Sequence, residues 1–171
     1  MKSCVIFGGA GFIGTHLARY FLRTGRFQRV HLADIRPTVL KGYDGVSFSQ
    51  TDVRQTIPED LIETPPEWIF NLAAIHREPG HEPFEYFETN IAGARNVCAY
   101  AEAVQCRKIY FTSSISVYGP TVGPTRESSP IRPTTPYGSS KFPAELIHEG
   151  WQRAGDDRRL VISRPGGVYG P

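Results

Sequence analysis

Hydrophobic positions along the chain form two kinds of pattern, short continuous runs and longer stretches with helical spacing. The short runs, bounded by glycine, proline or polar residues, predict buried strands at Ser3–Phe7, Arg29–Asp34, Val46–Gln50, Trp68–Ala73, Lys108–Ser113 and Leu160–Arg164. Helical spacing predicts helices from Ile13 to a closing glycine at Gly25, from Phe84 to Val104, and from Tyr137 to Arg153. Strands that alternate with helices predict an α/β fold with a doubly wound parallel sheet.

Proline and glycine predict where this regular pattern is interrupted. The proline-rich segment Gly119–Pro136 is expected to be a loop. Pro143 lacks an amide hydrogen, so we expect it to kink the last helix or to end its first regular turns. The final residues, Gly166–Pro171, lead into a turn and suggest no finishing helix or strand. We therefore expect residues 1–171 to be one domain of a longer protein.

Composition narrows the functional classes. A length of 171 residues fits a single domain. Nineteen Lys and Arg residues against 17 Asp and Glu, without a basic block, do not favour nucleic-acid binding. No apolar run approaches the roughly 20 residues that cross a bilayer. The three cysteines fit neither a metal nor a disulfide spacing, so we expect a cytoplasmic protein with no metal site.

A glycine-rich turn joins the first predicted strand to the first helix. Gly8, Gly11 and Gly14 are spaced three apart, and Gly9, Gly11 and Gly14 also fit the dinucleotide-binding pattern. Glycine allows a tight turn and lets the backbone approach a pyrophosphate, which the amide groups at the helix N-terminus can bind. A glycine triplet alone can be a plain strand–helix turn, but its placement here favours dinucleotide binding.

Asp34 ends the second predicted strand and follows Gly14 by 20 residues, about the interval expected for a residue that binds ribose. Its carboxylate would accept bonds from the adenosine ribose hydroxyls, which favours NAD over NADP. The alternative is an ordinary aspartate at a strand end, and Arg36 could instead meet a 2′-phosphate. Asp52 and Val53 could border the adenine, although alone they are more typical of a turn and a helix start.

Three further residues suggest proton transfer. Tyr137 and Lys141 are four apart and therefore share one face of the last predicted helix. A free tyrosine has a pKa of roughly 10, and a neighbouring ammonium favours its phenolate. Ser114, at the end of the fifth strand, can hold a substrate hydroxyl. Each residue alone is typical of a structural position, but together with the glycine turn they indicate a catalytic set.

In order and spacing, these motifs resemble the N-terminal part of an extended short-chain dehydrogenase/reductase of the NAD-dependent epimerase/dehydratase family. The resemblance covers essentially the whole chain. It is carried by Gly8–Gly14, Asp34, Asp52-Val53, Asn71–Ala74, Asn90, Ser113–Gly119, Tyr137–Lys141 and Arg164–Pro171. It implies a Rossmann-type NAD-binding domain, with a substrate domain expected beyond residue 171.

The resemblance also implies roles for individual residues. Tyr137 would be the acid/base, Lys141 would bind the nicotinamide ribose and tune Tyr137, and Ser114 would be the third catalytic member. Besides Gly8, Gly11, Gly14 and Asp34, the expected cofactor contacts are Phe12, Ile13, Ile35, Asp52, Val53, Leu72, Ala73, Ala74, Asn90, Tyr137, Lys141, Pro165 and Val168.

Departures from the family pattern bear on the reaction. Family dehydratases carry an Asp-Glu pair after the serine or threonine, whereas this chain has Ile115 and Ser116, which cannot act as acid or base. Gly167 stands where many relatives have an asparagine that contacts substrate. We therefore expect a nucleotide-sugar epimerase. The alternatives are a nucleotide-sugar reductase or dehydrogenase, a non-catalytic NAD sensor, and an inactive cofactor-binding fragment.

Two further expectations concern ligands and partners. His76, His81 and Glu82 lack a converging third or fourth metal ligand, so a substrate-facing or solvated loop is expected there. Relatives dimerise through a four-helix bundle, and the helices Phe84–Val104 and Tyr137–Arg153 are the candidates for a homodimer. Their surplus apolar positions are Ala92, Val97, Ala101, Ala144, Ile147 and Trp151. The alternative is that these side chains face the sheet.

Overall fold

The computed structural model describes residues 1–76 and 79–170, and Arg77, Glu78 and Pro171 lie outside the described residues. Within that part of the chain, six strands form one parallel sheet in the order β3-β2-β1-β4-β5-β6. The strands are β1 (Ser3–Phe7), β2 (Arg29–Asp34), β3 (Val46–Gln50), β4 (Trp68–Asn71), β5 (Lys108–Thr112) and β6 (Arg159–Ser163). This order is that of a doubly wound Rossmann-type sheet, with its switch point between β1 and β4.

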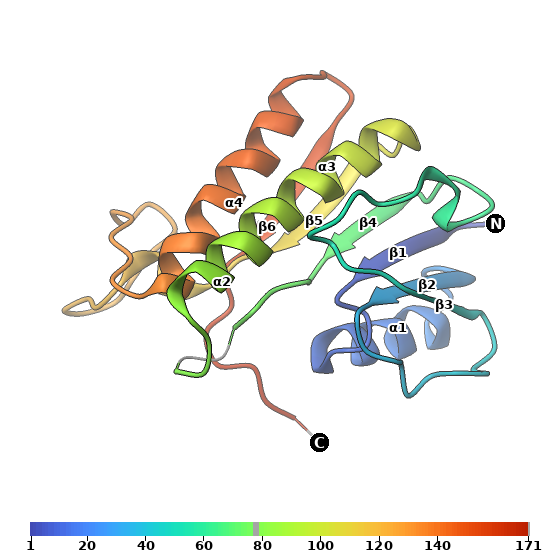
Figure 1. Ribbon diagram of the computed structural model, residues 1–171, viewed down its shortest axis with the longest axis horizontal. Coiled ribbons are helices and arrows are strands. Elements are labelled where there is room, and N and C mark those ends of the chain that lie inside the picture. Colours follow the sequence, from blue (N-terminus) through green and yellow to red (C-terminus); the bar gives the residue numbers. More distant parts are fainter. Residues whose placement is uncertain (77–78, 171) are drawn as a thin grey trace.

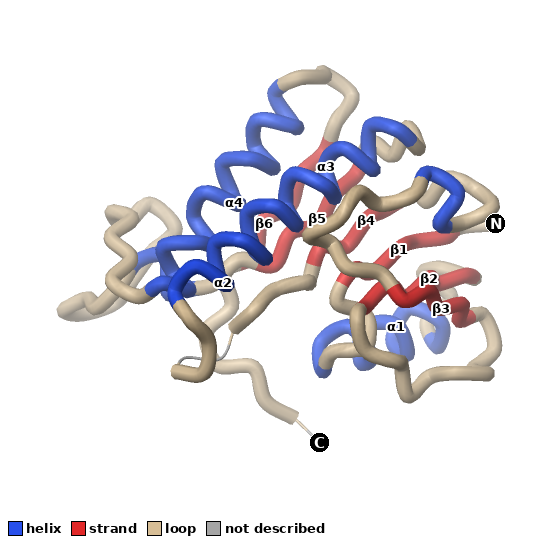
Figure 2. Tube along the Cα trace, viewed as in Figure 1, coloured by secondary structure: helices blue, strands red, loops and turns tan. Residues whose placement is uncertain are grey.

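Helices cover both faces of the sheet (Figures 1 and 2). α1 (Phe12–Arg23) lies on one face, while α3 (Gly93–Ala103) and α4 (Pro136–Arg153) pack beside each other on the other face. α2 (Pro83–Phe87) is joined to α3 by a π-helical turn, Glu88–Ala92. Short 3-10 turns lie at Glu59–Leu61 and Ile115–Tyr118.

The predicted elements agree with this fold, with small differences at their ends. The first three strands have the predicted bounds, β4 and β5 end before the predicted residues, and β6 begins and ends one residue earlier than predicted. The long helix predicted from Phe84 to Val104 contains the π-helical turn, which the spacing did not predict. α4 runs through Pro143 without ending, so the prediction that Pro143 could end its first turns is wrong.

Successive residues of β1 enter different hydrophobic cores, because side chains alternate between the faces of a strand. Cys4 and Ile6 pack with Phe21 of α1, whereas Val5 and Phe7 pack in the core that contains α3. Since both faces of the sheet are covered by helices, the central strands are apolar without interruption. This explains why their sequences form continuous hydrophobic runs.

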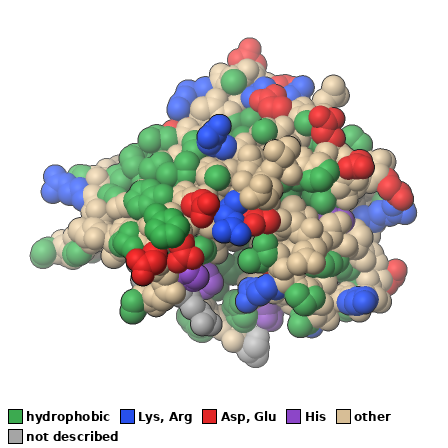
Figure 3. All heavy atoms as spheres, viewed as in Figure 1, with side chains coloured by type: hydrophobic (Ala, Val, Ile, Leu, Met, Phe, Trp, Pro, Cys, Tyr) green, Lys and Arg blue, Asp and Glu red, His purple; other side chains and the backbone are tan. Residues whose placement is uncertain are grey.

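The apolar side chains expected at a dimer interface are mostly core residues. Val97, Ala101, Ala144 and Trp151 are buried, and the partly buried Ile147 packs on the same cores. The alternative that these side chains face the sheet is therefore correct. Exposed apolar side chains on these helices belong instead to Phe84 and Phe87 of α2 and Leu146 of α4. Figure 3 shows hydrophobic side chains gathered over this part of the surface.

None of the helices in residues 1–76 and 79–170 has the length and apolar character needed to cross a membrane.

Candidate functional site

The parallel sheet brings most of the predicted site residues to one edge. All six described strands point the same way (Figure 1), so the segments that follow them emerge at the carboxyl edge. These segments are the glycine turn after β1, Asp34 at the end of β2, Asp52-Val53 after β3, Leu72–Ala74 after β4, Ser114 after β5 and Arg164–Gly170 after β6. Ligands of open α/β sheets bind at this edge, beside the switch point.

The glycine turn packs directly against the segment that follows β4. Gly8 has φ +77°, and a Cβ there would lie 2.7 Å from the amide nitrogen of Ala73. The Leu72 amide also donates to the carbonyl of Phe7 at 2.9 Å. A side chain at Gly8 would therefore push apart the two segments that flank the switch point. Gly9 is equally tight, since a Cβ there would lie 2.8 Å from the carbonyl oxygen of Ile6.

The N-terminus of α1 has the features of an anion site. Gly11 is the N-cap and offers no side-chain cap, and no acidic residue lies in the first turn. The first amide groups of a helix lack intrahelical partners and bind phosphate groups readily. Phe12 is 47% exposed at this terminus. The glycine turn and helix terminus therefore fit a dinucleotide pyrophosphate, and their contact with the cofactor stays a prediction.

Asp34 is buried at the end of β2 and is bonded to the glycine turn. Its Oδ2 accepts a hydrogen bond from the Ala10 amide at 3.0 Å, and its Oδ1 accepts one from the Arg36 amide at 3.0 Å. Each carboxylate oxygen has a second lone pair and can accept another bond. The side chain thus holds the turn and keeps acceptor capacity for ribose hydroxyls. The neighbouring Ile35 is 56% exposed at the same edge.

The Asp52-Val53 segment is a turn rather than a helix start, so that part of its interpretation is wrong. Asp52 pairs with Arg54 at 2.7 Å, and this hydrogen-bonded pairing lowers the pKa of the Asp52 carboxyl. Val53 is buried, and its carbonyl accepts a bond from Asn96 at 2.8 Å. A Cβ at Gly93 would lie 2.9 Å from the Val53 side chain. Val53 therefore anchors the turn to α3.

The first turn of α4 docks closely on the turn that follows Ser114. Thr135 caps the helix by accepting a bond from the Gly138 amide at 3.1 Å. A Cβ at Gly138 would lie only 2.5 Å from the carbonyl oxygen of Ser116. Ser114, which is 8% exposed, caps its own 3-10 turn through its hydroxyl. Glycine at position 138 therefore allows the helix that carries Tyr137 to approach the serine.

Lys141 lies one turn further along α4 and is almost completely buried. Its ammonium lies over the ring of Phe111, 4.4 Å from the centroid, in a cation–π contact. Burial lowers the pKa of Lys141 to about 7, while the charge of Glu145 acts in the opposite direction. His148 stacks on the same ring at 4.2 Å, and burial lowers its pKa to about 4.

Asn90 lies in the π-helical turn and is buried among protein partners. Its amide nitrogen donates to the Ser140 hydroxyl at 2.8 Å, and its oxygen accepts from the Ile75 amide at 3.2 Å. π-Helical turns often occur at functional sites because they redirect a side chain. Asn90 thus connects the segment after β4 to α4, while its expected contact with the cofactor stays a prediction.

The segment after β6 crosses the same edge of the sheet. The Pro165 carbonyl accepts a bond from the Ile115 amide at 3.1 Å. A Cβ at Gly170 would lie 3.3 Å from the ring of Phe12, so the segment runs from the Ser114 turn toward α1. Val168 is 51% exposed on this segment.

Two residues that the sequence analysis did not single out complete the environment of α4. Glu145 is fully buried and forms an ion pair with Arg164, with an N–O distance of 2.6 Å. The spacing of four residues from Lys141 to Glu145 is visible in the sequence, but the partner across the fold is not. Arg164 belongs to the Arg164–Pro171 stretch that resembles the family, yet the residues around it do not show that Glu145 is its ion-pair partner.

The histidines expected in a loop are exposed. His76 is exposed, and the ring of His81 lies 3.4 Å from a carboxylate oxygen of Glu85. Arg77 and Glu78 of this loop lie outside the described residues. Elsewhere in the described chain, no group of three His, Cys, Asp or Glu residues is arranged to hold a metal.

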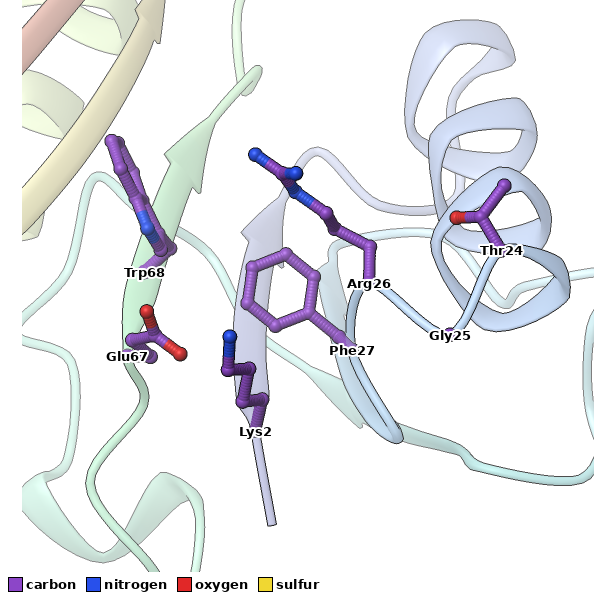
Figure 4. Close-up of a pocket in the computed structure, with 7 residues that line it drawn as sticks. All are labelled: Lys2, Thr24, Gly25, Arg26, Phe27, Glu67 and Trp68. Carbon is purple, nitrogen blue, oxygen red and sulfur yellow. The ribbon is translucent and has the colours of Figure 1, made fainter.

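A separate hollow of about 380 Å³ lies at the opposite edge of the sheet (Figure 4). Its lining residues are Lys2, Thr24, Gly25, Arg26, Phe27, Glu67 and Trp68. Lys2 and Glu67 directly precede β1 and β4, so the hollow is at the amino ends of the strands. It is therefore not part of the candidate dinucleotide site.

Fold and site together define the chain as a dinucleotide-binding protein of the Rossmann type, in which the start of α4 packs on the turn after Ser114. More particularly, the chain belongs to the NAD dependent epimerase/dehydratase family, whose model matches residues 4–171. This confirms the family resemblance and the fold predicted from the sequence.

Relatives support the same assignment. The chain is 31% identical over 171 residues to N-acetyl-alpha-D-glucosaminyl-diphospho-ditrans,octacis-undecaprenol 4-epimerase of Escherichia coli O157:H7, covering 97% of this chain and 49% of that protein. The structure of UDP-glucuronic acid 4-epimerase from Bacillus cereus in complex with NAD matches with a TM-score of 0.87 and 25% identity, over 99% of this chain and 58% of that one. The NAD dependent NDP-hexosamine 5,6-dehydratase TunA matches with a TM-score of 0.81 and 30% identity, over 96% of this chain and 54% of that one. The chain spans about half the length of the curated relatives it matches.

Proposed function

We propose that this protein is an NAD-dependent nucleotide-sugar epimerase in which Tyr137 is the acid/base. The observation that carries the proposal is the close docking of α4 on the turn after Ser114, at the edge where the glycine turn lies. Ser114 and Tyr137 belong to these two closely packed segments, which supports their assignment as partners in proton transfer. A plain dinucleotide-binding fold would not need that pair.

The residues at the edge fit NAD. Glycine at positions 8 and 14 lets the turn pack tightly, because a Cβ at either position would lie 2.7 Å from backbone atoms, and the N-terminus of α1 can receive the pyrophosphate. Asp34 would accept bonds from the adenosine ribose hydroxyls, and its negative charge would repel the 2′-phosphate of NADP. Lys141 would bind the nicotinamide ribose. When bound, NAD supplies a site that takes up a hydride from the sugar and returns it.

Side chains of this protein would carry out the proton transfer that accompanies hydride transfer. The Tyr137 hydroxyl oxygen would take the proton of a sugar hydroxyl as the carbon loses hydride, and would return it afterwards. The Ser114 hydroxyl would orient that sugar hydroxyl, and the Lys141 ammonium would favour the phenolate form of Tyr137.

Elimination of water is disfavoured by the two residues after Ser114. Ile115 has no ionisable group, and the Ser116 hydroxyl accepts a hydrogen bond from the Ser114 hydroxyl at 3.1 Å. Neither residue can supply the acid or base that a dehydratase needs. Because TunA is a dehydratase that matches this chain, the preference for epimerisation rests on these two positions rather than on the family.

Substrate class and assembly extend the proposal. Relatives named for UDP-glucose and UDP-glucuronic acid suggest a UDP-sugar as substrate, bound between this domain and a substrate domain beyond residue 171.

We also propose a homodimer through a four-helix bundle, with Phe84, Phe87 and Leu146 at the interface because they are the exposed apolar side chains of α2 and α4.

The test uses the whole protein that contains this chain, incubated with NAD and either UDP-glucose or UDP-glucuronic acid. Chromatography should show conversion to the 4-epimer, and absorbance should show no net NADH. Tyr137→Phe should abolish conversion while leaving NAD affinity within about twofold. Tyr20→Phe, at a tyrosine of α1 that is 51% exposed, is the matched control and should keep full activity.

The alternatives give different results in the same assay. A reductase or dehydrogenase would change the NADH concentration in proportion to product. A sensor would bind NAD without converting either sugar. Retention of most activity by Tyr137→Phe would show that the acid/base assignment is wrong. The isolated chain of 171 residues is expected to bind NAD and to convert neither sugar.

A further inference from the structure

Two buried side chains of opposite charge lie on the face of α4 that points into the protein. Lys141 is 1% exposed and Glu145 is 0% exposed. Because the two residues are four apart in a helix, their side chains are neighbours on one face. Burial of a charged group is unfavourable without a partner of opposite charge. One turn further along the helix, Glu149 is 37% exposed and pairs with Arg153.

Glu145 also forms a two-bond ion pair with Arg164, just after β6. The Arg164 Nε donates to Glu145 Oε1 at 2.9 Å, and its Nη2 donates to Oε2 at 2.6 Å. Such paired bonds fix the orientation of both groups. Arg164 Nη1 further donates to the hydroxyl of Tyr118 at 2.6 Å. One carboxylate therefore connects α4, the exit of β6 and the 3-10 turn that begins after Ser114.

The charged and titratable groups around Glu145 come from three segments. Lys141 and His148 lie on α4, Arg164 follows β6, and Tyr118 closes the 3-10 turn. Ion pairing with Glu145 raises the pKa of Arg164, which stays charged, whereas burial keeps His148 neutral near pH 7. Without the Glu145 charge, two cations would face each other across this cluster, and Lys141 is the one that can lose its proton.

We propose that Glu145 is a positioning residue of the catalytic set: its carboxylate is the counter-charge of the buried Lys141 ammonium, and through Arg164 it holds the turn after Ser114 against α4. The inference rests on the proposed function, in which the charged form of Lys141 binds NAD. A purely structural ion pair would support the fold equally at every pH near neutrality. If Glu145 is instead the counter-charge of Lys141, removal of its charge should weaken NAD binding more at pH 8 than at pH 6.

The variant Glu145→Gln keeps the size of the side chain and removes its charge. Lys141 in this variant should lose its proton at lower pH than in the unsubstituted protein. At pH 6 we expect the NAD dissociation constant to rise by about twofold or less. At pH 8 we expect it to rise about tenfold, which corresponds to roughly 1.4 kcal/mol. Glu145→Asp, which retains the charge, should restore most of the affinity at pH 8.

Calorimetric titration of the whole protein with NAD, at pH values from 6 to 9, measures these constants. Glu149→Gln removes a partly exposed carboxylate one turn further along the same helix and is the matched control, with no change expected at any pH. Circular dichroism checks folding. If Glu145→Gln does not fold, the double variant Glu145→Gln/Arg164→Gln replaces it, because it leaves no unpaired guanidinium. The side chain of Arg164 is 22% exposed and that of Glu145 is 0% exposed, so Arg164 lies on the solvent side of the pair. The double variant should therefore still weaken NAD binding more at pH 8 than at pH 6.

A loss of affinity that is the same at pH 6 and pH 8, or no loss, would overturn the inference and leave the proposed function standing. Equal weakness of Glu145→Asp and Glu145→Gln at pH 8 would also overturn it, because the charge would then not be the deciding property. Absence of NAD binding by the unsubstituted protein would overturn the proposed function itself, and the inference with it.

Discussion

Two glycines of α4 are expected to respond in opposite ways to the same substitution. Alanine is preferred over glycine inside a helix by about 0.8–1 kcal/mol. Gly150 has nothing within 4 Å of the position that a Cβ would take. Gly150→Ala should therefore stabilise the protein by about 0.5–1 kcal/mol, because helix propensity is the only property that changes.

Gly138→Ala should instead destabilise the protein. The new Cβ would lie 2.5 Å from the Ser116 carbonyl oxygen and 3.2 Å from the Cβ of Pro133. Ordinary contacts begin near 3.4 Å, so either α4 or the 3-10 turn must move by most of an ångström. Overpacking of this kind costs about 1–3 kcal/mol, and the helix propensity of alanine offsets part of it. We expect a net loss of about 1–2 kcal/mol.

Thermal unfolding followed by circular dichroism measures both effects. For a domain of this size, 1 kcal/mol shifts the Tm by about 2–4 °C. Gly138→Ala should therefore melt about 2–8 °C lower than the unsubstituted protein, and Gly150→Ala about 1–4 °C higher. Because the shift also moves Tyr137 away from the Ser114 turn, Gly138→Ala should lose conversion of UDP-sugars in the whole protein. A Gly138→Ala variant that melts at or above the unsubstituted protein would refute the close docking of α4.

Three further outcomes are expected. The Asp34→Asn side chain cannot accept both backbone hydrogen bonds, so urea unfolding should show a loss of stability of about 2 kcal/mol, and calorimetry should show no preference for NAD over NADP. The control Asp44→Asn, at an exposed aspartate, should change neither property. An unchanged preference for NAD in Asp34→Asn would contradict the role of Asp34. Lys141→Met should raise the free energy of unfolding by about 2 kcal/mol at pH 6, because the buried ammonium destabilises the native state below its pKa of about 7 and Glu145 keeps its ion pair with Arg164. That gain should shrink as pH rises from 7 toward 10, since Lys141 then becomes neutral in the native state while it is still charged in the unfolded chain; a gain independent of pH would contradict this account. Phe84→Glu should convert a dimer of the whole protein to a monomer, as measured by light scattering, whereas Tyr20→Glu on α1 should leave the dimer intact. A monomeric unsubstituted protein would contradict the proposed interface.

Elements that depend on a local pattern could be predicted from the order of the residues alone. Continuous apolar runs are required by strands that are covered on both faces, so the strand positions could be predicted within one or two residues. The glycine turn could also be predicted, because the positive φ at Gly8 and the helix N-terminus without a side-chain cap require particular residue types at particular spacing. The spacing of Tyr137 and Lys141 indicated a shared helical face for the same reason.

Contacts between side chains from distant segments depend on how the segments pack and could not be predicted from a local pattern. The ion pair of Glu145 with Arg164 joins residues from α4 and the exit of β6, and no local pattern states that these segments are adjacent. The orientation of helix faces was decided in the same way, since Val97 and Trp151 fill the core while Phe84 and Leu146 stay exposed. Apolar spacing shows that a helix has a buried face, but the direction of that face is chosen by the sheet and the neighbouring helices that pack on it.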